Sequence, residues 1–259
     1  MSRTWHLSDV ELIVLWDKLF GDRLPSPLFA LHRGANAEEW ARSATAAWSG
    51  VRNDGELHDA LGRIARAEVR VAVQAVDPRA PDRGDGPIRI LGGRQGAVAT
   101  LIRQLPGETI WHSGGYVVST GGAERLAGAV VGALPARDPG RLSDTQLVIA
   151  SESDAAEYDY GRSPALAGYL EIERRSAAWL ELPAERLGEI ETCLGSSIFG
   201  PRGIVAHRIA WRDLVDDGRY AVGEGTAPIA TAVDRARLAA MITADITKVL
   251  QTLEDERCA

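Results

Sequence analysis

The feature that most constrains the fold is a pattern that occurs twice along the chain. In each half a strand-like segment is followed by a turn, two further short strands and an amphipathic helix. Gly203–Ala206 parallels Gly96–Ala99 at a distance of 107 residues, and Leu238 follows Leu126 by 112 residues. A repeat of this length predicts an α+β fold of two antiparallel-sheet halves with flanking helices, related by a quasi-twofold axis.

Three helices are predicted before the first strand of this pattern. Ser8 and Glu11 have the spacing of a capping box, and the helix that they begin should end near Gly21. Asn36 and Asp54 are suitable N-caps for a second and a third helix. The N-terminal half therefore begins with helices and continues with strands.

The alternation of valines with mostly polar residues over Glu68–Gln74 is typical of a half-buried strand. Further strand-like segments follow, at residues 88–91, 97–102, 109–112 and 116–119. We interpret the short pairs between them as turns, namely Gly92–Gly93, Pro106–Gly107 and Gly114–Gly115. Leu126, Val130 and Leu134 then recur every four residues in a helix that ends at Pro135.

Residues 136–143 are interpreted as a linker, so that residues 1–143 form the N-terminal half and residues 144–259 the C-terminal half. In the second half, two short strands are expected around Tyr220 and Ile229. A final helix carries its apolar residues on one face: Leu238, Ile242, Ile246, Val249 and Leu253.

Composition limits the classes of function. The chain has 259 residues, of which 45% are hydrophobic, and no apolar run approaches the roughly 20 residues that a membrane helix needs. The first fifteen residues lack the features of a signal peptide, so a cytoplasmic location is expected. With 36 acidic and 29 basic residues the net charge is −7, which disfavours nucleic acid as a partner.

No segment carries the spacing of a metal or cofactor site. Cys193 and Cys258 lie far apart, and the five histidines share no helical spacing. The glycines of Gly92–Gly96 lead into a strand and not into a helix, so we interpret them as a hairpin or β-bulge and not as a phosphate-binding loop. We therefore expect no metal, no cofactor and no catalytic residue.

One cluster could still supply acid–base chemistry. Asp213, Asp216 and Asp217 follow a strand that carries His207, and together they are the raw material for an alternative function as a small enzyme. The simpler interpretation is a surface turn whose Asp–Gly pair provides the positive φ that a tight turn needs.

Several segments, taken in order and spacing, carry a resemblance to a known family. They are Leu7–Leu12, Leu24–Leu28, Gly93–Ala99 before a helix ending in Leu134–Pro135, Trp211–Asp213 and Asp217–Tyr220. In these segments the chain resembles the EspG proteins of actinobacterial type VII (ESX) secretion, which keep PE–PPE substrates soluble in the cytosol.

The resemblance implies a chaperone and not an enzyme, with a central antiparallel sheet and flanking helices. It also implies that the apolar helical tip of a PE–PPE heterodimer docks on the sheet and the C-terminal helices, in a complex of one copy each. A structural subunit of the secretion system is a further alternative, and the free protein could form a dimer. The loops at 78–86 and 154–164 depart most clearly from the family.

We expect the partner-binding surface to lie in the second half. The period of a strand puts Val205, His207, Ile209 and Trp211 on one face, and Arg219 and Tyr220 lie in the adjacent hairpin. Aromatic and arginine side chains are frequent at the centres of interfaces. This face is interpreted either as part of the core or as the groove for the partner.

Overall fold

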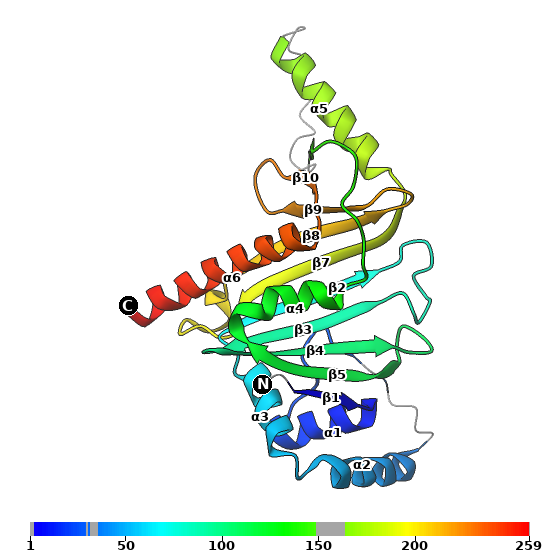
Figure 1. Cartoon of the computed structure of the whole chain (residues 1–259), viewed down its shortest axis with the longest axis vertical. Coiled ribbons are helices and arrows are strands. Elements are labelled where there is room, and N and C mark those ends of the chain that lie inside the picture. Colours follow the sequence, from blue (N-terminus) through cyan, green and yellow to red (C-terminus); the bar gives the residue numbers. More distant parts are fainter. Residues whose placement is uncertain (1–2, 30, 32–35, 149–163, 259) are drawn as a thin grey trace.

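The computed structural model describes residues 3–29, 31, 36–148 and 164–258, and an antiparallel sheet runs through the middle of this part of the chain (Figure 1). Its ten strands have the order β1-β5-β4-β3-β2-β7-β8-β9-β10-β6. None of the described helices is long and apolar enough to cross a membrane.

The bounds of the elements are as follows. The strands are β1 (Thr4–Leu7), β2 (Val69–Val76), β3 (Ile88–Gln95), β4 (Val98–Pro106), β5 (Ser113–Gly122), β6 (Thr145–Gln146), β7 (Ala184–Leu194), β8 (Ala206–Leu214), β9 (Arg219–Gly223) and β10 (Ile229–Ala232). The helices are α1 (Asp9–Phe20), α2 (Ala37–Val51), α3 (Gly55–Ala65), α4 (Leu126–Ala133), α5 (Pro164–Leu180) and α6 (Arg235–Cys258), with short 3₁₀ turns η1 (Ala123–Arg125) and η2 (Gly200–Gly203).

The order of the strands confirms the quasi-twofold α+β fold. β2 and β7 pair at the centre of the sheet, and each begins a four-stranded meander that leads into a helix, α4 or α6. β1 and β6 are the two edge strands, each beside the last strand of its meander. Because both halves share one sheet, the boundary between residues 143 and 144 stays a prediction.

The three predicted helix N-termini are confirmed. Ser8 accepts a hydrogen bond from the Glu11 amide while the Glu11 carboxylate accepts one from the Ser8 amide, and Gly21 ends α1 at φ 65°. Asn36 and Asp54 cap α2 and α3 with side-chain bonds of 2.9 and 3.0 Å to backbone amides. These local signals specify where the helical layer begins.

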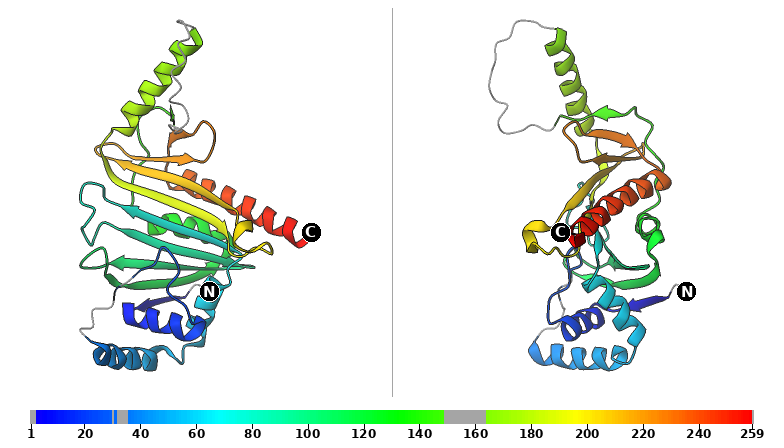
Figure 2. Two further views of the ribbon diagram at one scale, coloured as in Figure 1. Left: turned by 180° about the vertical axis from the view of Figure 1, so that it is seen from behind. Right: turned by 90° about the vertical axis from the view of Figure 1, so that its left-hand side faces the viewer.

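The two faces of the sheet are covered differently. Along β3, Ile90 packs into a cluster with α4 and α6, whereas the next residue, Leu91, packs into a cluster with α1 and α3. A smaller cluster packs the C-terminal end of α5, through Trp179, against Tyr220. Edge-on, α4 and α6 lie on one side of the sheet, and α1 to α3 lie at one end of the other side (Figure 2, right).

Three predictions about turns and strands are wrong. Gly92 and Gly93 lie inside β3, where they let helices approach both faces: added Cβ atoms would lie 2.8 Å from Leu126 Cδ1 and 3.0 Å from Ile64 Cδ1. Gly114–Gly115 likewise lies inside β5 and not in a turn. Residues 109–112 form a turn and not a strand.

Strands β1, β6 and β7 and helix α5 were not predicted. In β7 the apolar alternation is weak, because Gly188 and Thr192 take two of the buried-face positions. Trp211, on the neighbouring strand, lies opposite Gly188 and fills the space that a side chain would take there, since an added Cβ would fall 2.2 Å from the indole. The indole therefore supplies the packing that β7 itself lacks.

Substitution of Trp211 tests this packing. Trp211 is 1% exposed, so Trp211→Ala should lower the free energy of unfolding by about 3–5 kcal/mol. Trp111→Ala is the matched control because that indole is 55% exposed, and it should change stability by less than about 1 kcal/mol. Equal losses in urea unfolding of the two variants would contradict the packing described.

Candidate partner-binding surface

The predicted binding face of β8 lies mostly inside the protein. Ile209 and Trp211 are each 1% exposed and pack in the cluster beneath α6. Val205 and His207, at the start of the strand, are only half-buried. Of the two interpretations of this face, the structure therefore favours the core, because α6 covers it.

Arg219 and Tyr220 are buried as well. The Arg219 guanidinium forms a bidentate ion pair with Asp213, at 2.7 and 2.9 Å, and lies 4.5 Å from the centre of the Trp211 ring. Arg186 approaches the same carboxylate at 3.5 Å. Since Asp213 is fully buried, its charge depends on these two arginines.

The same hairpin holds the segment that connects the two halves. Arg219 donates from its backbone to Asp138 and from its side chain to the Pro135 carbonyl, at 2.8 and 3.2 Å. The Tyr220 hydroxyl donates to Asp217 at 2.5 Å and accepts from the Leu142 amide at 2.7 Å. Burial and the Asp217 hydrogen bond raise the pKa of Tyr220 to about 12. The hairpin is thus a clamp on residues 135–142.

These contacts exclude the acidic cluster as one site. His207 precedes Asp213 by six residues on one strand, which separates them by about 20 Å, and its ring faces Glu224 at 3.8 Å. Burial alone would raise the pKa of Asp217, but hydrogen bonds from Tyr220 and Arg141 outweigh it and lower that pKa. No cluster with metal-binding geometry occurs among the described residues.

The turn itself differs from the prediction in one detail. The residue with positive φ is Asp216, at 56°, and not the glycine of the Asp–Gly pair. Aspartate tolerates this conformation better than most side chains, because its short polar group can bond locally. Asp216 is exposed, and its backbone carbonyl accepts a hydrogen bond from Arg141.

The opposite face of β8 belongs to an open strip of the sheet, which we call the open face. It consists of the outward side chains of β2, β7 and β8: Arg70, Ala72, Gln74, Glu189, Glu191, Cys193, Arg208, Ala210 and Arg212. All are partly or fully exposed. From behind, the middle strands are seen uncovered between α5 at one end and α1 to α3 at the other (Figure 2, left).

Charged side chains cross the open face. Arg208 bridges Glu191 at 2.7 Å and Glu189 at 3.7 Å. Arg212 lies 4.9 Å from the Trp179 ring and donates to the carbonyls at the end of α5, and Arg70 donates to the Ala65 carbonyl. The open face has three arginines and two glutamates, so it is slightly basic, whereas the whole chain has a net charge of −7.

Each end of the open face has a distinct shape. At one end a hollow of about 400 Å³ is lined by side chains that include Val76, Arg89 and Leu187. At the other end the loop between β7 and β8 exposes Ile198 and Phe199. The open face is therefore a broad surface with apolar groups at both ends.

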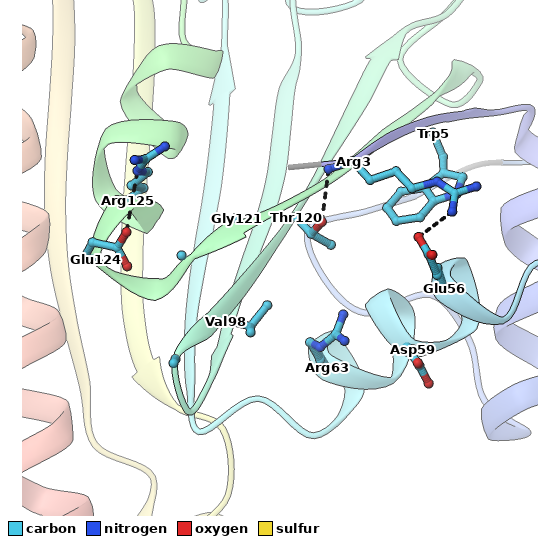
Figure 3. Close-up of a pocket in the computed structure, with 12 residues that line it drawn as sticks. Arg3, Trp5, Glu56, Asp59, Arg63, Val98, Thr120, Gly121, Glu124 and Arg125 are labelled. Atoms are coloured by element: carbon cyan, nitrogen blue, oxygen red, sulfur yellow. Dashed lines mark hydrogen bonds and ion pairs between the residues drawn. The ribbon is translucent and has the colours of Figure 1, made fainter. Parts of the chain in front are cut away.

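A further hollow lies between α3, η1 and the ends of β1 and β5 (Figure 3). It measures about 540 Å³, and Arg3 at its rim is paired with Glu56 and with Asp54 at 3.4 Å. Arg125 pairs with Glu124 at 3.5 Å. Its described lining contains no histidine and no cysteine, and two of its carboxylates, Glu56 and Glu124, are paired with arginines.

Comparison with known proteins now identifies the family. A sequence model of the EspG family matches residues 8–244. The chain belongs to the EspG family. Among solved structures it is similar to the Mycobacterium tuberculosis type VII secretion system chaperone EspG5 in complex with the PE25–PPE41 dimer, with a TM-score of 0.55 and 12% identity over 97% of this chain and 96% of that one. No curated protein matches this chain.

At this identity the likeness to EspG5 shows the fold alone. The open face was not among the residues expected to bind a partner, although its side chains alternate with those that were. The sequence does carry a signal for this face: Arg208 and Arg212 are too polar for a core face, and Ala210 between them is too small to contribute much to one. This EspG-family chain thus exposes the side of β8 that the tryptophan does not occupy.

The clamp can be tested by removing its buried carboxylate. Asp213→Ala leaves two arginines without their partner and should lower the free energy of unfolding by about 3–5 kcal/mol. Asp216→Asn is the matched control, because the side chain is exposed and asparagine tolerates positive φ, and it should stay within about 0.5 kcal/mol of the parent. Chemical denaturation measures both, and a stable Asp213→Ala variant would contradict the clamp.

Proposed function

We propose that this protein is a cytosolic chaperone of type VII secretion that binds the apolar tip of a PE–PPE heterodimer and keeps it soluble for export. Membership of the EspG family supports this role. EspG5, a structural neighbour, was solved in complex with a PE25–PPE41 dimer. The observation that carries the proposal is a broad, uncovered strip of sheet with apolar groups at its ends, which suits a protein partner better than a small substrate.

The partner in this proposal is a helical heterodimer, bound in a complex of one copy each. An exposed apolar helical tip is an aggregation liability until export, and a chaperone removes it by covering the tip. A stable cover should bury roughly 1,200–2,000 Å² in total. Catalysis has no place in this proposal, since Asp213 and Asp217 are used by the clamp.

We assign the docking site to the open face and not to the buried side of β8. The alternation of β8 leaves Arg208 and Ala210 exposed on the open face, while Ile209 and Trp211 are buried on the opposite face, and this exposure supports the assignment. The charged side chains of the open face are exposed, and Arg208 is already paired with Glu191 and Glu189, so they should add little affinity and binding should tolerate moderate salt.

Co-expression tests the function. Each PE–PPE pair encoded near this gene is produced with and without the protein, and soluble complex is measured by size-exclusion chromatography. At least one pair should be insoluble alone, become soluble on co-expression and co-elute at a ratio of one to one to one. If every pair is soluble alone and none co-elutes at micromolar concentration, a structural role in the secretion system replaces the chaperone.

A pair of surface variants tests the docking site. Ala210→Glu places a charged side chain in the middle of the open face, where it should weaken binding at least about tenfold without changing the thermal midpoint. Ala244→Glu makes the same change on the exposed side of α6, on the other side of the sheet, and should bind like the parent. Binding lost equally in both, or in neither, would remove the open face from the proposal.

A further inference from the structure

The loop between β7 and β8, residues 195–205, carries the two most exposed large apolar side chains of the described residues. Ile198 and Phe199 are 67% and 66% exposed, the highest values among the large apolar side chains of the described residues. Ile204, in the same loop, is 36% exposed. We call Ile198 and Phe199 the knob.

The loop that carries the knob is held in place by hydrogen bonds. The Glu256 carboxylate, near the end of α6, accepts from the Ser197 hydroxyl at 2.6 Å and from the Ile198 amide at 3.1 Å. The Ser197 hydroxyl in turn accepts from the Phe199 amide at 3.1 Å. The base of the loop is fixed by the Gly195 amide, which donates to the Glu68 carbonyl at 2.9 Å.

Glycines allow the loop to fold tightly around these bonds. Gly200 has a φ of 68°, which a glycine adopts without strain. At Gly203 an added Cβ would lie 2.1 Å from Ser197 Oγ and 2.9 Å from the Phe199 Cβ. Hydrogen bonds therefore hold the loop that carries the knob in a defined conformation, so little conformational entropy is lost when a partner covers the knob.

The position of the knob connects it with the open face. The loop follows Cys193 and precedes Arg208, so it stands at the end of the open face farthest from the hollow at Val76 and Leu187. Edge-on, it projects from the side of the sheet that α4 does not cover (Figure 2, right). A partner lying on the open face would meet the knob at this end.

We propose that Ile198 and Phe199 are the specificity-determining anchor of this chaperone and insert between the two helices at the tip of the PE–PPE heterodimer. This inference rests on the proposed function and names the contact that decides which partner is bound. Buried aromatic and aliphatic anchors dominate the energy of most interfaces. A groove between two helices accepts such an anchor, as helix pairs accept knobs from a neighbouring element.

Charge favours this occupant over a second copy of the chain. Arg202 is exposed in the same loop, whereas Arg208 is already paired with Glu191 and Glu189, and the whole chain has a net charge of −7. A second copy would bring a further −7, which opposes association at low salt. A complementary partner carries an acidic residue opposite Arg202, beside an apolar groove for the knob.

The test uses the PE–PPE pair that co-elutes with the parent protein. The double variant Ile198→Ser, Phe199→Ser should bind that pair at least about 30-fold more weakly by titration calorimetry, as expected for the loss of an interface hot spot. Its thermal midpoint should match the parent, because both side chains are exposed. Ile229→Ser, at a side chain that is 48% exposed on β10, is the matched control and should bind normally.

A third variant separates the shape of the loop from the knob itself. Glu256→Ala removes the anchor of the loop and leaves Ile198 and Phe199 in place, so we expect several-fold weaker binding, less than the loss in the double variant. If Glu256→Ala and the parent bind the pair with equal affinity, the loop conformation that Glu256 holds does not contribute to binding.

Each outcome distinguishes the inference from the function on which it rests. If the parent binds no pair, the proposed function and the inference both fail. If the parent binds and the double variant binds equally well, the knob is not the anchor although the chaperone function stands. If the double variant instead abolishes a dimer of the free protein, seen by sedimentation velocity, while partner binding persists, the occupant is a second copy and the inference is wrong.

Discussion

The antiparallel pairing of β2 with β7 joins the two halves of this chain into one sheet, and the other elements are arranged around it. The register runs without a shift from Val69 opposite Leu194 to Val76 opposite Leu187. On one face this pairing aligns Val71 and Val73 with Thr192 and Ile190, which gives α4 and α6 a common surface. Without it, each half would expose a long strand edge of the kind that promotes aggregation.

The clamp at Arg219 adds a second connection between the halves. After α4 ends, the chain must cross to the far edge of the sheet, and the hairpin of β8 and β9 holds this crossing at Pro135 and Asp138. The buried ion pair with Asp213 keeps the guanidinium in position for these bonds. Asp213 and Asp217, which belong to an apparent acid–base cluster in the sequence, therefore have a structural role, because arginines already compensate their charges.

Local signals in the sequence predicted where the helices begin. Contacts between distant segments determine which face of β8 is buried and why β7 forms a strand. The caps at Ser8, Asn36 and Asp54 act within one turn of helix, so a single sequence reveals them. Alternation in β8 correctly divides the strand into two faces, but which face is buried depends on where α6 returns, more than twenty residues later. β7 was missed because Trp211, on another strand, fills the space at Gly188.

The unequal coverage of the two faces explains how the protein can expose a binding surface and remain folded. At 24 residues, α6 spans about 36 Å and covers the apolar face of the second half by itself. The other face needs no such cover, because Arg208 with Glu191 and Arg212 with the carbonyls of α5 make its middle compatible with water. Apolar side chains of β2, β7 and their loops are exposed at the two ends of the open face, at the hollow beside Val76 and at the loop of Phe199. Because the middle of the open face is polar and its apolar groups lie apart at the two ends, the free protein can offer contacts to a partner without a large contiguous apolar patch.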